Sequence, residues 1–550
     1  MKKIWWKEEV IYQIYPRSFN DSNGDGIGDI PGIIEKLDYL KNLGVDIIWL
    51  SPIYDSPNDD NGYDISNYYK IHPEFGTMAE FDEMLKGLHD RGMKLIMDLV
   101  VNHSSDEHEW FEASRQSKNN AHRDYYIWKK GKDGGPPNNW KSFFGGSAWE
   151  YDKKTDEYYL HIFSKKQPDL NWENPNVRKE VYKNIRFWLD KGVDGFRMDV
   201  IPLISKRLEF ADANFESFGE CVEKMYSNGP RVHEFINEMY EAVLKEYDIM
   251  TVGEGPGITS KVGLNYVHES RGELSMIFHL DHMFLGFGSR GRFDVVSYDL
   301  KDVKRIFREW YDAMGDSGWV SIFLDNHDFA RMVSRWGNDT TYRIESAKML
   351  AMLVLTMRGT PSIYQGSEIG MTNVKFDSID DFDDLEALNF YKEFSEEGMS
   401  EKEFIEIANT TGRDNVRTPI QWDNNKHAGF TTGEPWIKVN PNYPSINAKI
   451  VLENPDSIYY FYKKMLAFRK ENLTLVYGKY EEIKTDNEQL FIYRRWDEAF
   501  EYYVVLNFSD KSSGFHLENI SSYECVIGNY LNNENTNLQP WEGRLYRKLI

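Results

Sequence analysis

Short apolar runs alternate with longer amphipathic stretches from about residue 10 to about residue 370. Eight of these runs have the length and the flanking residues that are typical of buried strands. They are Val10–Tyr15, Ile47–Pro52, Lys94–Val100, Gly195–Val200, Met250–Glu254, Ser275–Leu280, Ser321–Leu324 and Ser362–Tyr364. The stretches between them place apolar residues at helical spacing, and several end in glycine, as helices often do. This order predicts an α/β fold, a (β/α)₈ TIM barrel.

Two parts of the chain break this alternation. A long segment rich in Asn, Gly, Trp and Tyr follows the third strand, and its residues 141–163 have the pattern of a β-hairpin. Because loops of this length usually carry function, we interpret it as a subdomain over the barrel mouth. From about residue 480, short alternating segments predict a C-terminal antiparallel β-domain. The predicted boundaries are residues 1–102 and 173–478 for the catalytic barrel, 103–172 for the inserted subdomain, and 479–550 for a C-terminal β-sandwich. Residues 373–435 are expected to form an irregular, acidic excursion.

Composition and charge narrow the possible partners. The 550 residues are 41% hydrophobic and 15% aromatic, enough for a large core. The net charge of −24 argues against nucleic acid and against anionic membrane surfaces as partners. The start, MKKIWWKEEV, lacks the apolar stretch of a signal peptide, and the run Met349–Met357 is too short to span a bilayer. Cys221 and Cys525 lie far apart without metal-type spacing, so we expect a cytoplasmic protein.

Acidic residues stand at or just after the C-terminal ends of several predicted strands. They are Asp199 in GFRMDV, Glu254 in MTVGEG and Asp328 in IFLDNHD. Buried carboxylates are unfavourable unless they serve a purpose, and the C-terminal mouth of a TIM barrel is where active sites form. Arg197 precedes Asp199 by two residues and therefore lies on the same face of its strand. Two carboxyl groups flanking a sugar bond are the minimal machinery of glycoside hydrolysis.

These segments, in this order, resemble the α-amylase family of glycoside hydrolases, and within it the intracellular α-glucosidases of the oligo-1,6-glucosidase group. Long stretches carry the resemblance over essentially the whole chain: WWKEEVIYQIYPRSFNDSNGDGIGDI, SPNDDNGYDIS, SFFGGSAWEYD, GRDNVRTPIQWD and HAGFTTGEPWI. The resemblance implies an enzyme that acts on a small oligosaccharide, and we expect it to be a monomer.

The resemblance also implies a role for each acid at a strand end. Asp199 would be the nucleophile that forms a covalent glucosyl-enzyme, with Arg197 keeping its carboxylate ionised. Glu254 would act first as the general acid and then as the general base, which requires a raised pKa. Asp328 would hold the sugar hydroxyls and stabilise the transition state. Two carboxyl groups about 5–5.5 Å apart would give retention of configuration.

A closed pocket for one terminal glucose is implied in the same way. Asp60 would hold the non-reducing end by hydrogen bonds, Tyr63 would stack on it, and Arg413 would pair with Asp60, with Arg417 as the alternative. Asp98 would brace the site. The full set of expected substrate-binding residues is Asp60, Tyr63, His103, Phe144, Phe163, Arg197, Val200, His327 and Arg413.

A second candidate site lies in DSNGDGIGD, residues 21–29. Its oxygen-rich spacing resembles the first part of an EF-hand loop and suits a hard cation. The predicted ligands are Asp21, Asn23, Asp25, the carbonyl of Ile27, and Asp29. Because the related enzymes carry calcium or magnesium here, we expect a structural Ca²⁺ or Mg²⁺ and no cofactor for catalysis. A solvated acidic turn is the alternative interpretation.

The sequence indicates the reaction more clearly than the glycosidic linkage that the enzyme prefers. In the related enzymes a valine at the position of Val200 accompanies α-1,6 preference, whereas Pro202, Gly255 and residues 278–294 depart from their pattern. An α-1,4-glucosidase therefore remains an alternative. A trehalose-6-phosphate hydrolase would need a basic leaving-group subsite, for which Lys261, Arg271, Arg290 and Arg292 are candidates. A sucrose isomerase or glucosyltransferase would share the catalytic residues, but the isomerases carry an RLDRD segment that this chain lacks. A non-catalytic transporter subunit would need a transmembrane helix.

Overall fold

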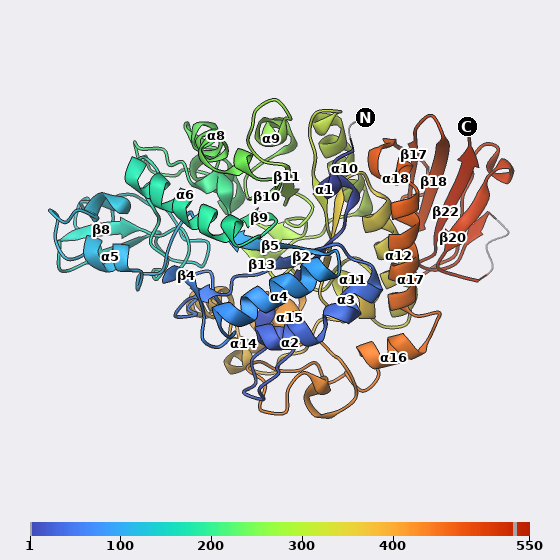
Figure 1. The fold of residues 1–550 in the computed structure, drawn as a ribbon, viewed down its shortest axis with the longest axis horizontal. Helices are drawn as coiled ribbons and strands as arrows, with labels where there is room; N and C mark the ends of the chain where they lie inside the picture. Colours follow the sequence, from blue (N-terminus) through green and yellow to red (C-terminus); the bar gives the residue numbers. More distant parts are fainter. Residues whose placement is uncertain (1–2, 532–535) are drawn as a thin grey trace.

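Eight parallel strands form the centre of the computed structural model, which describes residues 3–531 and 536–550. Their order in the sheet is β11-β10-β9-β5-β2-β1-β15-β14, and a parallel bridge between Ile277 and Val320 joins the two end strands. The sheet therefore closes into a barrel, and the (β/α)₈ prediction is confirmed (Figure 1). The strands are β1 (Ile11–Ile14), β2 (Ile47–Leu50), β5 (Lys94–Leu99), β9 (Gly195–Met198), β10 (Met250–Gly255), β11 (Met276–His279), β14 (Ser321–Ile322) and β15 (Thr360–Tyr364).

The barrel strands are buried along almost their whole length, as parallel strands covered by helices on one side and by core on the other should be. Strand β9 ends at Met198, so Asp199 is the first residue beyond it. Glu254 is the penultimate residue of β10, whereas β14 ends at Ile322 and leaves Asp328 on the following loop. All three acids consequently face the same end of the barrel.

Helices surround the barrel, and local sequence signals define their ends. Thr77 and Glu80 form a capping box at the start of α4, and Asn174 caps α6. The main outer helices are α2 (Ile30–Glu35), α3 (Leu37–Leu43), α4 (Met78–Asp90), α6 (Pro175–Asp190), α8 (Val232–Ala242), α9 (Ser260–Val267), α10 (Leu300–Met314), α12 (Arg343–Thr356) and α17 (Ile458–Glu471). Shorter helices are α1 (Trp5–Glu8), α7 (Phe218–Cys221), α11 (Met332–Trp336), α16 (Ala448–Glu453) and α18 (Thr474–Tyr477).

The segment after β5 contains a small sheet in the order β6-β8-β7 and a short helix, α5 (Glu109–Ser114). Its strands are β6 (Trp128–Lys129), β7 (Trp149–Asp152) and β8 (Glu157–Leu160), and β7 pairs with β8 as the predicted hairpin. Trp140, Trp149 and Leu160 share a core with Val200 and Tyr226, which anchors this segment beside the loop that follows β9. In Figure 1 it projects from the barrel on the side opposite the C-terminal sheet.

The expectation that residues 373–435 are irregular is wrong. This region contains α13 (Leu385–Glu396), α14 (Glu401–Thr411) and α15 (Asp414–Arg417). Asp384 and Ser400 cap the first two helices, and Phe394 and Phe404 pack on Phe293 of the hairpin β12–β13 (Phe287–Gly288 and Gly291–Val295). Most of the acidic residues lie on the outer faces, although Asp384 and Asp414 are buried, and the apolar residues supply a small separate core.

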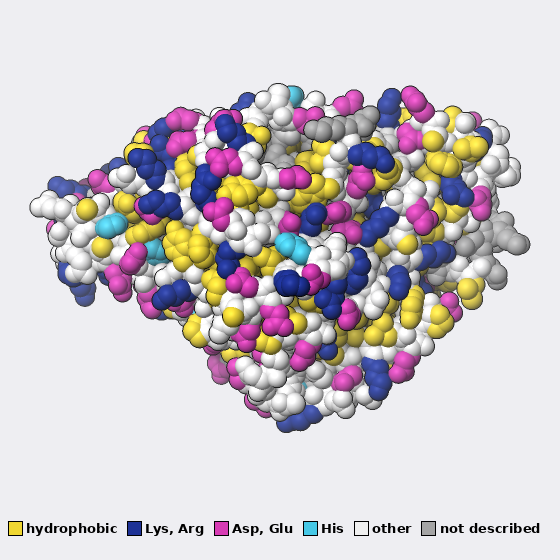
Figure 2. Space-filling model, viewed as in Figure 1, with side chains coloured by type: hydrophobic (Ala, Val, Ile, Leu, Met, Phe, Trp, Pro, Cys, Tyr) yellow, Lys and Arg dark blue, Asp and Glu magenta, His cyan; other side chains and the backbone are white. Residues whose placement is uncertain are grey.

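The C-terminal region is an antiparallel sheet in the order β16-β17-β18-β22-β20, with a second sheet of β19 and β21. The strands are β16 (Lys479–Glu482), β17 (Leu490–Trp496), β18 (Phe500–Asn507), β19 (Ser513–Gly514), β20 (Glu524–Gly528), β21 (Asn537–Leu538) and β22 (Gly543–Leu549). The predicted antiparallel domain is therefore present, whereas its boundaries and those of the inserted subdomain stay predictions. The helices in residues 3–531 and 536–550 all fall short of the length and apolar character needed to cross a membrane. Acidic and basic side chains are interspersed over the face drawn in Figure 2.

Candidate active site

A pocket opens at the C-terminal end of the barrel strands. Its volume of about 110 Å³ is below the roughly 300–1,000 Å³ typical of pockets for drug-sized ligands, so it suits a single sugar unit. Of the predicted catalytic and substrate-binding residues, all but Arg197 line it. The lining residues are Asp60, Tyr63, His103, Phe143, Phe144, Phe163, Asp199, Val200, Glu254, Pro256, Leu280, Phe284, Arg292, His327, Asp328, Phe329, Glu386 and Arg413.

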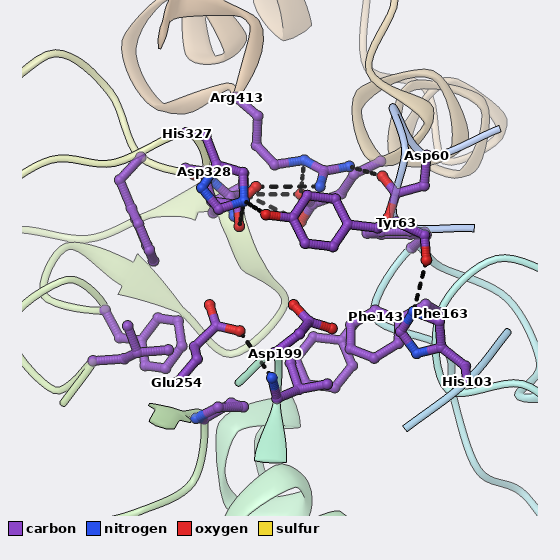
Figure 3. Close-up of a pocket in the computed structure, with 18 residues that line it drawn as sticks. Asp60, Tyr63, His103, Phe143, Phe163, Asp199, Glu254, His327, Asp328 and Arg413 are labelled. Carbon is purple, nitrogen blue, oxygen red and sulfur yellow. Dashed lines mark hydrogen bonds and ion pairs between the residues drawn. The ribbon is translucent and has the colours of Figure 1, made fainter. Parts of the chain in front are cut away.

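Arg197 lies beneath the pocket and joins the acids on its floor. Its Nη1 binds Asp199 Oδ1 at 2.7 Å, and its Nη2 binds Glu254 Oε2 at 2.8 Å. Asp98 Oδ1 binds Nη1 from below at 2.5 Å, while its Oδ2 accepts from Trp49 and Tyr63. Asp98 is fully buried and does not line the pocket, which agrees with the bracing role predicted for it. Figure 3 shows Asp199 and Glu254 on one side of the pocket, opposite Asp328 and His327.

The pKa shifts in this cluster match the sequence-based expectation for Glu254 but not for Asp199. Burial raises the pKa of Glu254, as predicted, but it also raises the pKa of Asp199 well above the usual range, although Arg197 opposes both shifts. Burial raises the pKa of Asp98 as well. Three buried carboxyl groups share the single positive charge of Arg197, so their protonation is coupled. The raised pKa of Glu254 favours the protonated form that a general acid needs.

Asp328 carries the opposite shift. Burial disfavours its charge, but His327, Arg413 and Arg417 hold the pKa of Asp328 below its ordinary range. Burial also lowers the pKa of His327 to about 3, so this ring is neutral near pH 7 and the arginines provide the compensating charge. The amide of Gln13 lies 2.9 Å from His327 Nδ1, which leaves Nε2–H to donate toward the Tyr63 hydroxyl at 2.7 Å or Asp328 at 3.2 Å. The lowered pKa of Asp328 thus favours its ionised form at the pocket surface.

The closed end of the pocket is more heavily bonded than predicted. Arg413 lies 3.5 Å from Asp60, but its shorter contact is to Asp384, at 2.6 Å. It also contacts Glu386 at 3.3 Å and Asp328 at 3.4 Å. Asp60 is therefore a secondary partner, and burial raises the pKa of Asp60 to about 7. Arg417, the alternative in the sequence analysis, lies 3.3 Å from Asp328 without lining the pocket.

The inserted segment supplies one wall. Phe144 and Phe163 line the pocket as predicted, and Phe143, which the sequence analysis missed, stacks on Phe163 with centroids 4.9 Å apart. His103 donates to the backbone carbonyl of Tyr63 at 3.2 Å, and burial lowers the pKa of His103 to about 4. The other missed lining residues are Pro256, Leu280, Phe284, Arg292, Phe329 and Glu386.

Val200 has an unusual backbone. Its φ of 34° and ψ of 40° lie in the left-handed region, which is unfavourable for a β-branched residue. In this conformation its N–H donates to Glu254 Oε2 at 3.1 Å. The neighbouring Gly255 has little room for a side chain, because a Cβ there would lie 3.2 Å from Ile277 Cδ1 and from the Phe278 carbonyl oxygen. The glycine at position 255, which departs from the pattern of the related enzymes, is therefore explained by close packing against β11.

The candidate cation loop is folded around its own backbone. Asp21 accepts from the N–H groups of Asn23, Gly24 and Gly26 at 2.7–3.0 Å. Asp25 accepts from Ile27 N–H, and Asp29 caps α2 and binds Ser22. Among residues 3–531 and 536–550, no three acidic, His or Cys side chains are grouped to hold a metal ion. Asp29, whose two oxygens are occupied by these bonds, fits the predicted ligand set least.

The candidate phosphate-binding cations are mostly engaged. Arg271 binds Glu273 at 2.7 Å, and Arg290 binds Glu397 at 2.6 Å. Arg292 binds Glu386 at 3.0 Å and donates to the Asp328 carbonyl oxygen at 2.6 Å. Of these three only Arg292 lines the pocket, so a phosphate there would compete with existing ion pairs.

Two acids bound to one buried guanidinium, in the mouth of a TIM barrel, are the arrangement of a glycoside hydrolase. The catalytic domain of the α-amylase family matches residues 13–478, and the chain belongs to this family. An oligo-1,6-glucosidase of Parageobacillus thermoglucosidasius is 56% identical over 558 residues, covering 100% of this chain and 99% of the relative. The predicted resemblance is thereby confirmed.

Enzymes named for other substrates are also similar to this chain. The trehalose-6-phosphate hydrolase of Bacillus subtilis strain 168 is 46% identical, covering 99% of this chain and 98% of the relative. Among solved structures, a mutant isomaltulose synthase of Erwinia rhapontici NX5, in complex with its natural substrate sucrose, has a TM-score of 0.96 at 45% identity. The match covers 100% of this chain and 99% of that structure. The fold is thus shared among enzymes of different specificity, and the residues around the pocket must decide between them.

Proposed function

We propose that the protein is a retaining, exo-acting α-glucosidase that releases terminal α-1,6-linked glucose from isomalto-oligosaccharides. The observation that carries this proposal is the bridge of Arg197 between Asp199 and Glu254 on the pocket floor. The pocket is closed at the far end by Asp60 and Arg413, which suits the non-reducing end of a chain. The high identity to oligo-1,6-glucosidases supports the linkage.

In the first step, an Asp199 carboxylate oxygen forms a bond to the anomeric carbon while the glycosidic bond breaks. Glu254 gives its proton to the leaving oxygen, so the leaving group departs as a neutral alcohol. The raised pKa of Glu254 favours the protonated form that this step requires. Asp328, ionised beside Arg413 and Arg417, stabilises the positive charge that develops on the sugar ring.

In the second step, Glu254 takes a proton from water, and the resulting oxygen nucleophile attacks the anomeric carbon. The bond to Asp199 breaks, and glucose leaves with its original α configuration. The Val200 N–H keeps Glu254 Oε2 in place through both steps. His103 and Tyr63, which also line the pocket, would contact the bound sugar.

The proposal is tested with isomaltose, maltose, sucrose, trehalose and trehalose-6-phosphate, with the products followed by NMR. We expect the highest kcat/KM for isomaltose and α-glucose as the first product. Cleavage of trehalose-6-phosphate alone would contradict the specificity. Formation of a sucrose isomer in place of free glucose would assign the chain to the isomerases instead, and β-glucose as the first product would exclude the retaining mechanism.

We also propose a structural Ca²⁺ or Mg²⁺ in the loop of residues 21–29, a cytoplasmic location and a monomeric state. The oxygen-rich loop supports the cation, and the free thiols of Cys221 and Cys525 are compatible with a reducing compartment. The cation is tested by the melting temperature with EDTA and after calcium is added back. A melting temperature that does not change would contradict it. Size-exclusion chromatography with light scattering tests the monomer.

A further inference from the structure

The mouth of the pocket on the Glu254 side is formed by apolar residues. Leu280 and Phe284 follow β11, the strand that pairs with β10 at Glu254. Pro256 follows β10, and Phe329 completes this side of the lining. Because Glu254 protonates the leaving oxygen, the leaving group must lie on this side. The residues that meet it therefore differ in character from those around the glucose.

Phe284 is the exposed member of this group. Its side chain is 40% exposed, and it is the one phenylalanine among the large hydrophobic residues that are exposed in the described chain. Its ring rests on two others, with centroids 6.1 Å from Phe329 and 6.3 Å from Phe287. Those two stack on each other at 6.2 Å and 14°, with the Arg292 and Arg335 guanidinium groups beside them. The exposed ring of Phe284 is thus supported by the packed rings of Phe287 and Phe329.

Charge at the mouth does not favour an anionic or strongly polar leaving group. The lining contains two arginines, of which Arg413 lies at the closed end and Arg292 lies beside Phe287 and Phe329. Both arginines bind carboxylates. An added phosphate would compete with Glu386 and the Asp328 carbonyl oxygen for Arg292, whereas a flat apolar group would cover the exposed ring and release water from it.

We propose that Phe284 is the platform for the leaving group, and that it gives the enzyme a preference for α-glucosides of alcohols that carry an aromatic ring. This rests on the proposed α-glucosidase function and specifies its substrate class. Aromatic rings prefer offset or edge-to-face packing at centroid distances of about 4.5–7 Å, which the support of Phe284 by Phe287 and Phe329 allows. The reaction is unchanged: water supplies the hydroxyl of glucose, and the aromatic alcohol leaves with the proton of Glu254.

The test compares benzyl α-glucoside with methyl α-glucoside. Both leaving groups are primary alkoxides that require protonation by Glu254, so the ratio of their kcat/KM values reports mainly on contact with the phenyl ring. We expect the wild-type enzyme to favour the benzyl glucoside, and Phe284→Ala to lower this ratio about fivefold. Phe284→Tyr, which keeps the ring, should retain the ratio. Tyr69→Ala is the matched control, because Tyr69 is also 40% exposed but lies on β4 (Asn67–Ile71) and not at the pocket.

A ratio that stays the same in Phe284→Ala, or falls equally in Tyr69→Ala, would overturn the inference while leaving the α-glucosidase intact. Failure of the wild-type enzyme to cleave methyl α-glucoside and isomaltose would instead overturn the proposed function. A higher kcat/KM for trehalose-6-phosphate than for trehalose would show that the mouth accepts an anion, and would also contradict the platform. Melting temperatures confirm that each variant is folded.

Discussion

The closed end of the pocket and its mouth differ in how tightly their side chains are bonded. At the closed end, Arg413 contacts four carboxylates, and His327 is bonded through both ring nitrogens. The mouth is lined by Leu280, Phe284 and Phe329. Their apolar side chains do not impose a hydrogen-bonding pattern on the leaving group. A network of buried polar bonds tolerates one ligand shape, whereas an apolar surface tolerates many. The difference predicts that a change of leaving group is tolerated better than a change of the sugar at the closed end.

The largest effect is expected from removal of the nucleophile Asp199, which lies between the closed end and the mouth. Asp199→Asn should lower kcat for an aryl α-glucoside by about 10⁴-fold or more, because an amide oxygen does not form the glucosyl-enzyme. The fold should persist, since the change removes one of three carboxyl groups that compete for Arg197. Enzyme assays and melting temperatures measure the two effects. Substantial remaining activity in a folded variant would contradict the assignment of Asp199.

Arg413→Ala would disrupt the ion-pair network at the closed end of the pocket. Four carboxylates would lose a buried partner, so we expect a loss of about 3–5 kcal/mol of stability and about 100-fold in kcat/KM. Arg494→Ala is the control, because Arg494 also binds two carboxylates but lies at the surface of β17, where an ion pair contributes about 0–1 kcal/mol. Chemical denaturation and isomaltose hydrolysis measure both quantities. Equal small effects in the two variants would show that the closed end is not a rigid network.

The sequence predicted the barrel and most of the pocket, because both depend on local patterns. Strand ends mark Asp199 and Glu254, and long family stretches mark Asp60 and Arg413. The partners of Arg413 could not be predicted, because Asp384 and Glu386 lie in a segment whose acidic composition concealed two helices. The left-handed backbone of Val200 was equally hidden, since a β-branched residue at a strand end favours extended geometry.

The pH dependence of stability tests whether burial at the closed end acts on Asp60. Its folded pKa, raised to about 7, exceeds the unfolded value of about 3.9, so the fold binds a proton there more tightly. This contribution is fully present below about pH 4 and is lost as the pH rises to about 7. Relative to Asp60→Asn, the wild-type free energy of unfolding should therefore fall across this range, by at most about 1.4 kcal/mol per pH unit.

The measurement is denaturant unfolding of both proteins between pH 4 and pH 8.5. Asp133→Asn, at an exposed position of the inserted segment, is the control and should follow the wild-type curve throughout. A difference between wild type and Asp60→Asn that is constant with pH would show that Asp60 is ionised in the fold over the whole range. The attraction of Arg413 and Arg417 for Asp60 would then outweigh the cost of burying its charge.

The smallest effect is expected at Val200, where the catalytic floor meets the mouth. Val200→Thr keeps the β-branched shape and the N–H that binds Glu254, but it places a hydroxyl in the pocket wall. We expect the ratio of kcat/KM for maltose to that for isomaltose to rise about threefold, because a new hydrogen-bonding group alters the leaving-group position without removing a catalytic one. Val296→Thr, at an exposed position outside the pocket, should leave the ratio as it is. An unchanged ratio in Val200→Thr would place linkage preference in the apolar mouth alone, with Phe284 as the residue to vary next.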